Sequence, residues 1–249
     1  MAEIRAVLFD LDGTLLRVQM AEFIPRYIHG LAKYCVDYVT PKKFEQAMLS
    51  AIRSLIRHTG DGEITNEQRL FSILQQQLTV PEKVLRQALE SYRQGDIEEL
   101  QPLVKSIPLA TTIVKECLQQ QIPLVLATNP VFPEFMISAR LKWAGLDDLR
   151  FDHLTSYENS RYCKPQSGYF SEIAAQLGIE PKHCLMVGND TQHDLAAAAV
   201  GMQTFLVDTW IIEREGSSWP CEHRGDHLQL QQFLQQRLAS GVRTWQRLE

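Results

Sequence analysis

A short segment near the start of the chain places two carboxylates directly after an apolar run. It reads Ala6-Val7-Leu8-Phe9-Asp10-Leu11-Asp12-Gly13-Thr14-Leu15, and its first part has the length and composition of a buried strand. Side chains two residues apart on a strand point the same way, so we expect both carboxylates to leave the strand end on one side. Two ionised carboxylates in a partly dry site repel each other, which predicts a bound metal ion or a shared proton. Taken alone, the segment also fits an ordinary polar turn or a calcium loop.

Further apolar runs of strand length alternate with helical segments in the second half of the chain. Strands are expected over residues 122–127, 151–154, 184–187 and 204–207, and helices over residues 110–119, 135–144, 169–177, 195–200 and 228–238. This alternation predicts an α/β fold with a Rossmann-like parallel sheet and helices on both faces. The functional groups of such sheets gather at the carboxyl ends of the strands.

The segment from about residue 18 to residue 100 has a different character. Its apolar residues recur at helical spacing, and no convincing strand interrupts them. We therefore expect about four amphipathic helices whose apolar stripes are buried: Phe23, Ile24, Tyr27, Ile28 and Leu31 in one helix, and Phe44, Ala47, Met48, Ala51, Ile52 and Leu55 in the next.

Composition limits the partners that this chain can have. Its 249 residues carry 25 basic and 30 acidic side chains, a net charge of −5, which predicts no attraction to nucleic acid or to an anionic membrane. Neither a membrane span nor a secretory leader is apparent, so a cytoplasmic protein is expected. The five cysteines lack a CxxC pair and are expected to be reduced thiols. His223 and His227 are expected to be solvated polar residues of the tail rather than metal ligands.

Polar residues follow the predicted strands at three further points. Thr128-Asn129, Lys164-Pro165 and Gly188-Asn189-Asp190, with Asp194 four residues later, are the three groups. Singly, each has an ordinary structural explanation. Thr128 could cap the following helix and Lys164 could be solvated, while the acids after the third strand could stabilise a helix N-terminus.

Taken together with Asp10-x-Asp12-Gly13-Thr14, the three groups resemble the four signature motifs of the haloacid dehalogenase (HAD) superfamily, in order and in placement at strand ends. The resemblance covers residues 1–15 and about 102–210. It implies a catalytic core domain formed by residues 1–15 and 102–249, with an inserted all-helical cap domain over residues 16–101. It also implies Mg²⁺-dependent hydrolysis of a small-molecule phosphate monoester through an aspartyl-phosphate.

The resemblance assigns the chemistry to particular residues. Asp10 would be the nucleophile. Asp12 would be the general acid and then the general base, at a pKa raised by its neighbours. Thr128, Asn129 and Lys164 would hold the phosphoryl oxygens, with Lys164 also neutralising the nucleophile.

The same resemblance implies a metal site. Asp10, the backbone carbonyl of Asp12, and Asp190 would hold Mg²⁺. Asp194 would bind a metal water or orient Lys164, and Asn189 is a possible neutral ligand.

Several alternatives stay open at this point. Pro130 stands where relatives more often have a small residue with an amide, so either one phosphate donor is missing or a helix begins there. A phosphomutase would share Asp10 and Asp12, and a catalytically silent binding or regulatory protein would keep the fold. Dehalogenase chemistry is disfavoured because such relatives lack the second acid. The expected partner is a small phosphorylated metabolite, and the oligomeric state is left open.

Overall fold

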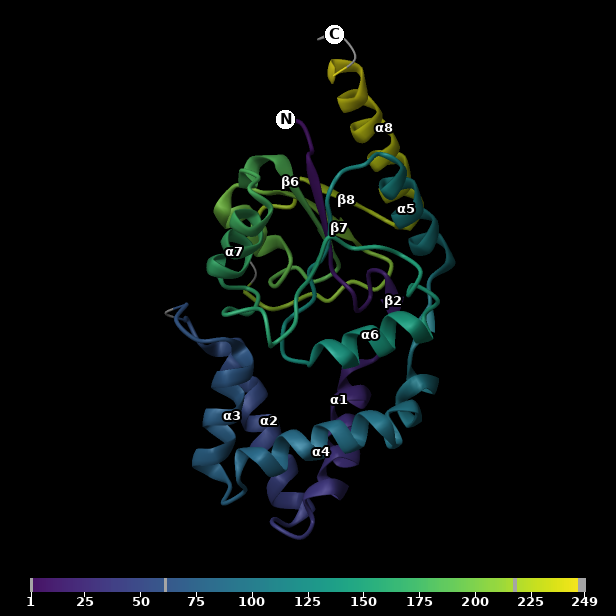
Figure 1. Ribbon diagram of the computed structural model, residues 1–249. Coiled ribbons are helices and arrows are strands. Elements are labelled where there is room, and N and C mark those ends of the chain that lie inside the picture. Colours follow the sequence, from purple (N-terminus) through teal and green to yellow (C-terminus); the bar gives the residue numbers. More distant parts are fainter. Residues whose placement is uncertain (1, 61, 217–218, 246–249) are drawn as a thin grey trace.

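A six-stranded sheet forms the centre of the computed structural model, which describes residues 2–60, 62–216 and 219–245 (Figure 1). The strand order is β5-β4-β1-β6-β7-β8, and each neighbouring pair is parallel. The strands are β1 (Ala6–Phe9), β4 (Leu124–Leu126), β5 (His153–Leu154), β6 (Cys184–Gly188), β7 (Gln203–Val207) and β8 (His223–Gly225). The parallel sheet predicted from the sequence is therefore confirmed. The edge strand β8 was not predicted, because its His-Arg-Gly sequence carries no apolar signal.

Helices cover both faces of the sheet. The side chains of β1 alternate between them: Val7 and Phe9 join the larger core cluster, whereas Ala6 and Leu8 join the smaller one. On the first face lie α5 (Pro108–Gln119), α6 (Glu134–Trp143) and α8 (His227–Trp245). On the second lie α7 (Ser167–Leu177) and the 3₁₀ helix η4 (Leu195–Val200), with η3 (Pro181–His183) beside them. The central strand is buried on both faces, as its continuous apolar run predicts.

A layer of helices is inserted between β1 and β4 and lies at one end of the sheet (Figure 1). This helical insert, residues 20–103, contains α1 (Met20–Ala32), η1 (Lys33–Cys35), α2 (Pro41–Arg57), α3 (Asn66–Gln77), α4 (Glu82–Gln94) and η2 (Asp96–Leu103). The stripes predicted for its first two helices are buried, except that Ile24 is only partly covered. The division of the chain into domains after residues 15 and 101 stays a prediction.

A small antiparallel ribbon marks where the chain enters and leaves the helical insert. β2 (Leu16–Arg17) pairs with β3 (Lys105–Ser106). Each strand has two residues, too short for a periodic pattern to reveal from sequence. The ribbon ties both ends of the insert together beside the loop that follows β1.

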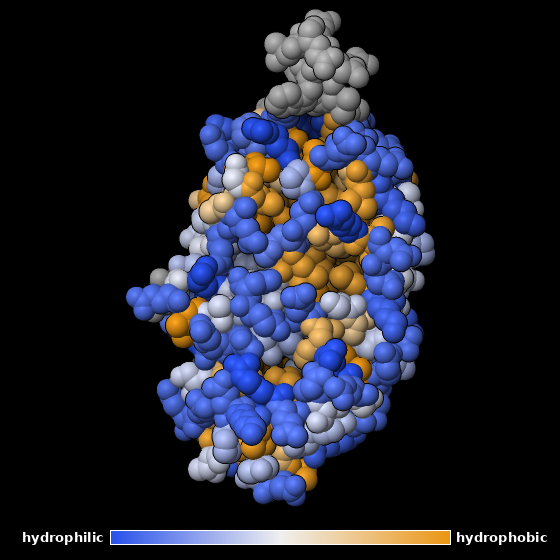
Figure 2. All heavy atoms as spheres, in the orientation of Figure 1, coloured by the Kyte–Doolittle hydropathy of each residue, from blue (hydrophilic) through white to orange (hydrophobic). Residues whose placement is uncertain are grey.

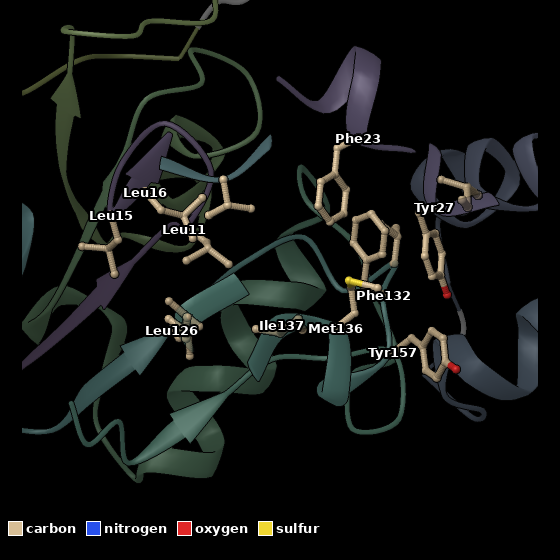
Figure 3. Close-up of a cluster of buried hydrophobic side chains, with 14 of the residues drawn as sticks. Leu11, Leu15, Leu16, Phe23, Tyr27, Leu126, Phe132, Met136, Ile137 and Tyr157 are labelled. Atoms are coloured by element: carbon tan, nitrogen blue, oxygen red, sulfur yellow. The ribbon is translucent and has the colours of Figure 1, made fainter. Parts of the chain in front are cut away.

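Aromatic side chains join the insert to the sheet layer. Phe23 and Tyr27 of α1 meet Phe132, which follows β4, in edge-to-face contacts with ring centroids 5.9 and 5.4 Å apart (Figure 3). Tyr157, after β5, lies on the same side of the cluster as Tyr27. The insert and the sheet layer therefore share one hydrophobic core.

Hydrophilic residues cover most of the face shown in Figure 2, and hydrophobic residues show mainly in its middle. Among the described residues, the large apolar side chains with high exposure are scattered along the chain: Val36, Tyr38, Ile64, Ile212 and Leu228. Within the described part of the chain, each helix is too short or too polar to cross a membrane.

Candidate active site

Polar side chains gather at the carboxyl edge of the sheet. Asp10 follows β1, Thr128 follows β4, and Asn189 and Asp190 follow β6, while Lys164 comes from the loop between β5 and α7. All of them are at most 9% exposed. The parallel register brings these strand ends to one edge, so the topology assembles groups that are far apart in the sequence.

Lys164 lies between two carboxylates. Its Nζ donates to Oδ1 of Asp10 at 2.9 Å and to Oδ1 of Asp194 at 2.7 Å. Burial lowers the pKa of Lys164, but the two carboxylates outweigh it and the net pKa is raised. Burial raises the pKa of Asp10, and the Lys164 charge opposes that shift. The lysine is therefore held charged beside the predicted nucleophile.

Asp194 uses both of its oxygens to organise the site. Oδ1 accepts from Lys164, and Oδ2 accepts from the backbone N–H of Asp190 at 2.9 Å. A Cβ at Gly188 would lie 2.2 Å from Asp194 Cγ, so only glycine lets this side chain fold back under β6. Of the two roles expected for Asp194, this geometry matches the orientation of Lys164.

Arg140 is bound to Asp12, a contact that sequence reasoning missed. Its Nη1 donates to both Asp12 carboxylate oxygens, at 2.8 and 2.7 Å, and its side chain has no exposure. Burial raises the pKa of Asp12 above its usual value, while the charges of Arg140 and then Lys164 lower it. The direction matches the expectation, but the cause is burial and not the neighbouring groups. The sequence does hold a signal for Arg140, because it occupies a core position of α6 at helical spacing from Met136 and Ile137.

The two carboxylates of the opening motif therefore have separate cations. Lys164 balances Asp10, and Arg140 balances Asp12. The sequence pattern predicts that a metal ion or a shared proton offsets the repulsion between these carboxylates. The structure adds a third way of offsetting it, a buried arginine.

Asp190 binds a second arginine that the sequence did not indicate. Arg214, in the loop between β7 and β8, donates from Nε to the two Asp190 oxygens at 3.0 and 2.7 Å, and its Nη2 lies 2.6 Å from Oδ2. Oδ1 of Asp190 also accepts from the backbone N–H groups of Gln192 and His193. Burial raises the pKa of Asp190, but Arg214 and His193 outweigh it and the net pKa is lowered.

The predicted Mg²⁺ ligands have suitable donor chemistry, with one obstruction. Carboxylates of Asp10 and Asp190 and a backbone carbonyl at Asp12 are the hard oxygen donors that Mg²⁺ prefers. Among the residues that the structure describes, no cluster of three or more His, Cys, Asp or Glu side chains is gathered to hold a metal. Arg214 occupies the Asp190 carboxylate, and its side chain is 38% exposed. The set fits Mg²⁺ once that guanidinium moves aside.

The loop after β4 is fastened to the lysine loop. Asn129 Oδ1 accepts from the backbone N–H of Lys164 at 3.2 Å. The carbonyl of Thr128 accepts from the hydroxyls of Thr155 at 2.7 Å and Tyr169 at 2.9 Å. The next helix, α6, begins at Glu134, so Thr128 does not cap it and no helix begins at Pro130.

Asn189 supports the loop that carries Asp12. Its Nδ2 donates to the carbonyl of Trp210 at 2.6 Å, and the side chain is 2% exposed. Gly13 has φ +93°, and a Cβ there would lie 2.1 Å from Asn189 Nδ2. Asn189 and Gly13 are thus packed against each other, and only glycine fits.

His227, expected to be solvated, is instead 5% exposed. Its Nε2 lies 2.8 Å from the carbonyl of Thr14 and its Nδ1 lies 3.1 Å from the Thr209 hydroxyl. That expectation was wrong because the residue begins α8 and its ring reaches the loop after Gly13.

The helical insert reaches the site loops through the start of α3. Asn66 is 2% exposed, and its Nδ2 donates to the carbonyls of Pro130 at 3.3 Å and Tyr162 at 3.2 Å. Its backbone N–H donates to the carbonyl of Ser160 at 2.8 Å. One amide therefore connects the insert to both loops that carry the predicted phosphate binders.

Comparison with known proteins gives consistent matches. A family model described as haloacid dehalogenase-like hydrolase matches residues 4–201. The chain is similar to ribulose-1,5-bisphosphate 5-phosphatase of Halopiger xanaduensis, with 29% identity over 216 residues, 82% of this chain and 84% of the relative. It is also similar to pyrophosphatase PpaX of Bacillus cereus, with 26% identity over 212 residues, 85% of this chain and 86% of the relative.

Solved structures match the overall fold. L-2-haloacid dehalogenase RSc1362 has a TM-score of 0.57 at 20% identity and covers 94% of this chain and 100% of its own. An HAD phosphatase from Thermococcus onnurineus has a TM-score of 0.57 at 19% identity and covers 93% of this chain and 98% of its own. At these sequence identities the two matches show that the fold is shared.

Proposed function

Because the chain belongs to the haloacid dehalogenase-like hydrolases, we propose that it hydrolyses the phosphate monoester of a small molecule through an aspartyl-phosphate. The observation that carries the proposal is the buried contact between Asp10 and Lys164, at 2.9 Å, with Asp194 holding the lysine from its other side. A carboxylate fixed beside a charged lysine at the carboxyl edge of a parallel sheet suits attack on an anionic phosphoryl group. The relatives named as phosphatases favour the same reaction.

In the first step, an oxygen of Asp10 attacks phosphorus and the bond from phosphorus to the ester oxygen breaks. Asp12 enters this step protonated, as its raised pKa favours, and gives that proton to the departing alkoxide, so the product alcohol leaves neutral. Lys164, the Thr128 hydroxyl and Asn129 hold the phosphoryl oxygens while negative charge redistributes among them.

In the second step, water attacks the aspartyl-phosphate. Asp12 takes a proton from that water, the bond from phosphorus to Asp10 breaks, and inorganic phosphate leaves. Mg²⁺, held by Asp10, the carbonyl of Asp12 and Asp190, would neutralise charge on the phosphoryl oxygens. Asp194 keeps Lys164 in place through both steps.

The helical insert favours a small substrate. Asn66 joins the insert to the carbonyls of Pro130 and Tyr162 beside the phosphate-binding loops. A layer held so close over the sheet edge favours a metabolite over a folded phosphoprotein as the substrate.

Phosphate release from a panel of sugar phosphates, phosphoglycolate, nucleoside monophosphates and aryl phosphates tests the proposal. We expect release with Mg²⁺, loss of release with EDTA, and loss with Asp10→Asn. Asp148→Asn makes the same chemical change at an exposed site of the same layer and should retain activity.

Three results would contradict the proposal. One is no release by the unchanged protein from any ester, and another is full activity of Asp10→Asn. Conversion of a sugar phosphate to its isomer without net release would identify a phosphomutase, and affinity without turnover would identify a binding protein.

A further inference from the structure

Arg140 is a charged side chain that the fold has removed from water. The side chain has no exposure, and its Nη1 donates to both Asp12 carboxylate oxygens. Its Nε and Nη2 are buried and have no hydrogen-bond partner. A buried arginine is costly to desolvate, and such groups are retained where a specific partner needs them.

Two aromatic rings enclose the guanidinium. Arg140 Cζ lies 4.9 Å from the ring centroid of Phe132 and 5.6 Å from that of Phe23. Figure 3 shows these two rings next to each other, in edge-to-face contact, with Phe23 on the helical insert and Phe132 on the sheet layer. The rings keep water from the guanidinium, and Coulombic attraction to Asp12 is stronger in such surroundings.

The contact between Arg140 and Asp12 gives Asp12 a cation other than Lys164. Asp10 and Asp194 already share Lys164, and the Lys164 charge also reaches Asp12. Without Arg140, the Asp12 carboxylate would be free to turn towards Lys164 and compete for it. With both oxygens bound by one nitrogen, Asp12 has a single orientation, and its side chain keeps 19% exposure on its open side.

We propose that Arg140 is a positioning residue that fixes the Asp12 carboxylate for proton transfer to the leaving group. The inference rests on the proposed phosphatase reaction, in which Asp12 exchanges the proton. The hydrogen bonds of the Arg140 side chain run to Asp12, so its effect should appear in the steps that use Asp12.

The effect of Arg140 on Asp12 can be isolated by comparing two esters whose leaving groups differ in how much they need a proton. p-Nitrophenolate departs readily without a proton, whereas the phenolate of phenyl phosphate is a stronger base and needs one. The ratio kcat/KM reports only the steps up to departure of the phenol, so it excludes hydrolysis of the aspartyl-phosphate. We expect Arg140→Met to lower kcat/KM for phenyl phosphate by about 10²-fold, the scale of general-acid catalysis, and for p-nitrophenyl phosphate by less than about 10-fold.

Two further measurements separate positioning from a structural role. In the Asp12→Asn background, Arg140→Met should cause no added loss with phenyl phosphate, because the residue acts through Asp12. The inhibition constant for inorganic phosphate should be unchanged, because the phosphate binders do not contact Arg140. Arg150→Met removes an exposed arginine of the same layer and should leave kcat/KM unchanged for both esters.

Arg140→Lys keeps the charge and serves if Arg140→Met fails to fold, as thermal unfolding will show. With its single ammonium, this variant should also lose more kcat/KM for phenyl phosphate than for p-nitrophenyl phosphate, but both losses should be smaller than in Arg140→Met. Equal losses for the two esters in a folded variant, or additive losses with Asp12→Asn, would overturn the inference while leaving the phosphatase proposal intact. Full activity of Asp10→Asn, or no hydrolysis of any ester by the unchanged protein, would instead remove the proposed function and this inference with it.

Discussion

The Asp190 carboxylate is clamped by the Arg214 guanidinium, with Nε 2.7 Å and Nη2 2.6 Å from Oδ2. The same carboxylate is the predicted Mg²⁺ ligand after β6, so the arginine and a metal ion bound there would compete for one anion. Arg214 is partly exposed and comes from a loop, whereas Asp190 is 5% exposed at a strand end. The arginine is therefore the partner that can move.

Removing that competitor should strengthen metal binding. We expect Arg214→Gln to bind Mg²⁺ several-fold more tightly than the unchanged protein in isothermal titration calorimetry, and to show a larger rise in Tm on adding Mg²⁺. Without Mg²⁺ its Tm should be lower, because Asp190 loses its counter-charge. Arg224→Gln breaks the surface pair with Asp208 and serves as the control. Unchanged Mg²⁺ affinity in Arg214→Gln would show that Asp190 does not hold the metal.

Loss of the Asp194 carboxylate should lower the stability of the protein. Asp194→Asn removes the charge that faces Lys164 at 2.7 Å in a site where both partners are at most 3% exposed. We expect a loss of about 1–3 kcal/mol in the free energy of unfolding by urea, the scale of a hydrogen bond between charged groups, because an amide oxygen carries no charge to balance the buried lysine. Asp208→Asn, in an exposed pair, should change it by less than about 1 kcal/mol. Equal effects of the two variants would refute the role of Asp194 in holding Lys164.

The turn after Asp12 should tolerate no side chain. Gly13→Ala meets both a positive φ of +93° and a Cβ position 2.1 Å from Asn189 Nδ2. Gly145→Ala meets a φ of +70° with open space around it, so it reports the backbone strain alone. Strain of this kind costs about 1–3 kcal/mol, and we expect Gly13→Ala to lower Tm more than Gly145→Ala and to reduce activity as well. A fully active Gly13→Ala would mean that the loop carrying Asp12 can shift without consequence.

Cutting the contact of Asn66 should loosen the helical insert locally. Asn66→Ala removes the donors to Pro130 and Tyr162, so hydrogen exchange should quicken at the start of α3 and in residues 157–166 while the sheet stays protected. The matched control is Gln75→Ala, because Gln75 is an exposed amide of the same helix. Identical exchange in the two variants would rule out Asn66 as the link between the insert and the site loops.

Local pattern was sufficient for much of the fold. Continuous apolar runs predicted β1, β4, β6 and β7, and helical spacing predicted the buried stripes of α1 and α2, because burial on a strand or helix follows the chain's own period. The polar groups that follow the strands also came from pattern, since a parallel sheet brings strand ends to one edge. β2, β3 and β8 were not predicted, because a strand of two or three residues is too short to show a periodic pattern.

The sequence alone could not show which charged and polar groups pair with each other. Arg140 lies 128 residues from Asp12, Arg214 lies 24 residues from Asp190, and Asn66 lies 64 residues from Pro130. Such pairs depend on where α6, the β7–β8 loop and the helical insert pack in space, and no periodic signal encodes that. The sequence by itself determined the acids, the lysine and the order in which they meet the sheet. Only the tertiary structure decided that Asp10, Asp12 and Asp190 each have their own cation, because desolvated charges must be paired by whatever the packing brings within reach.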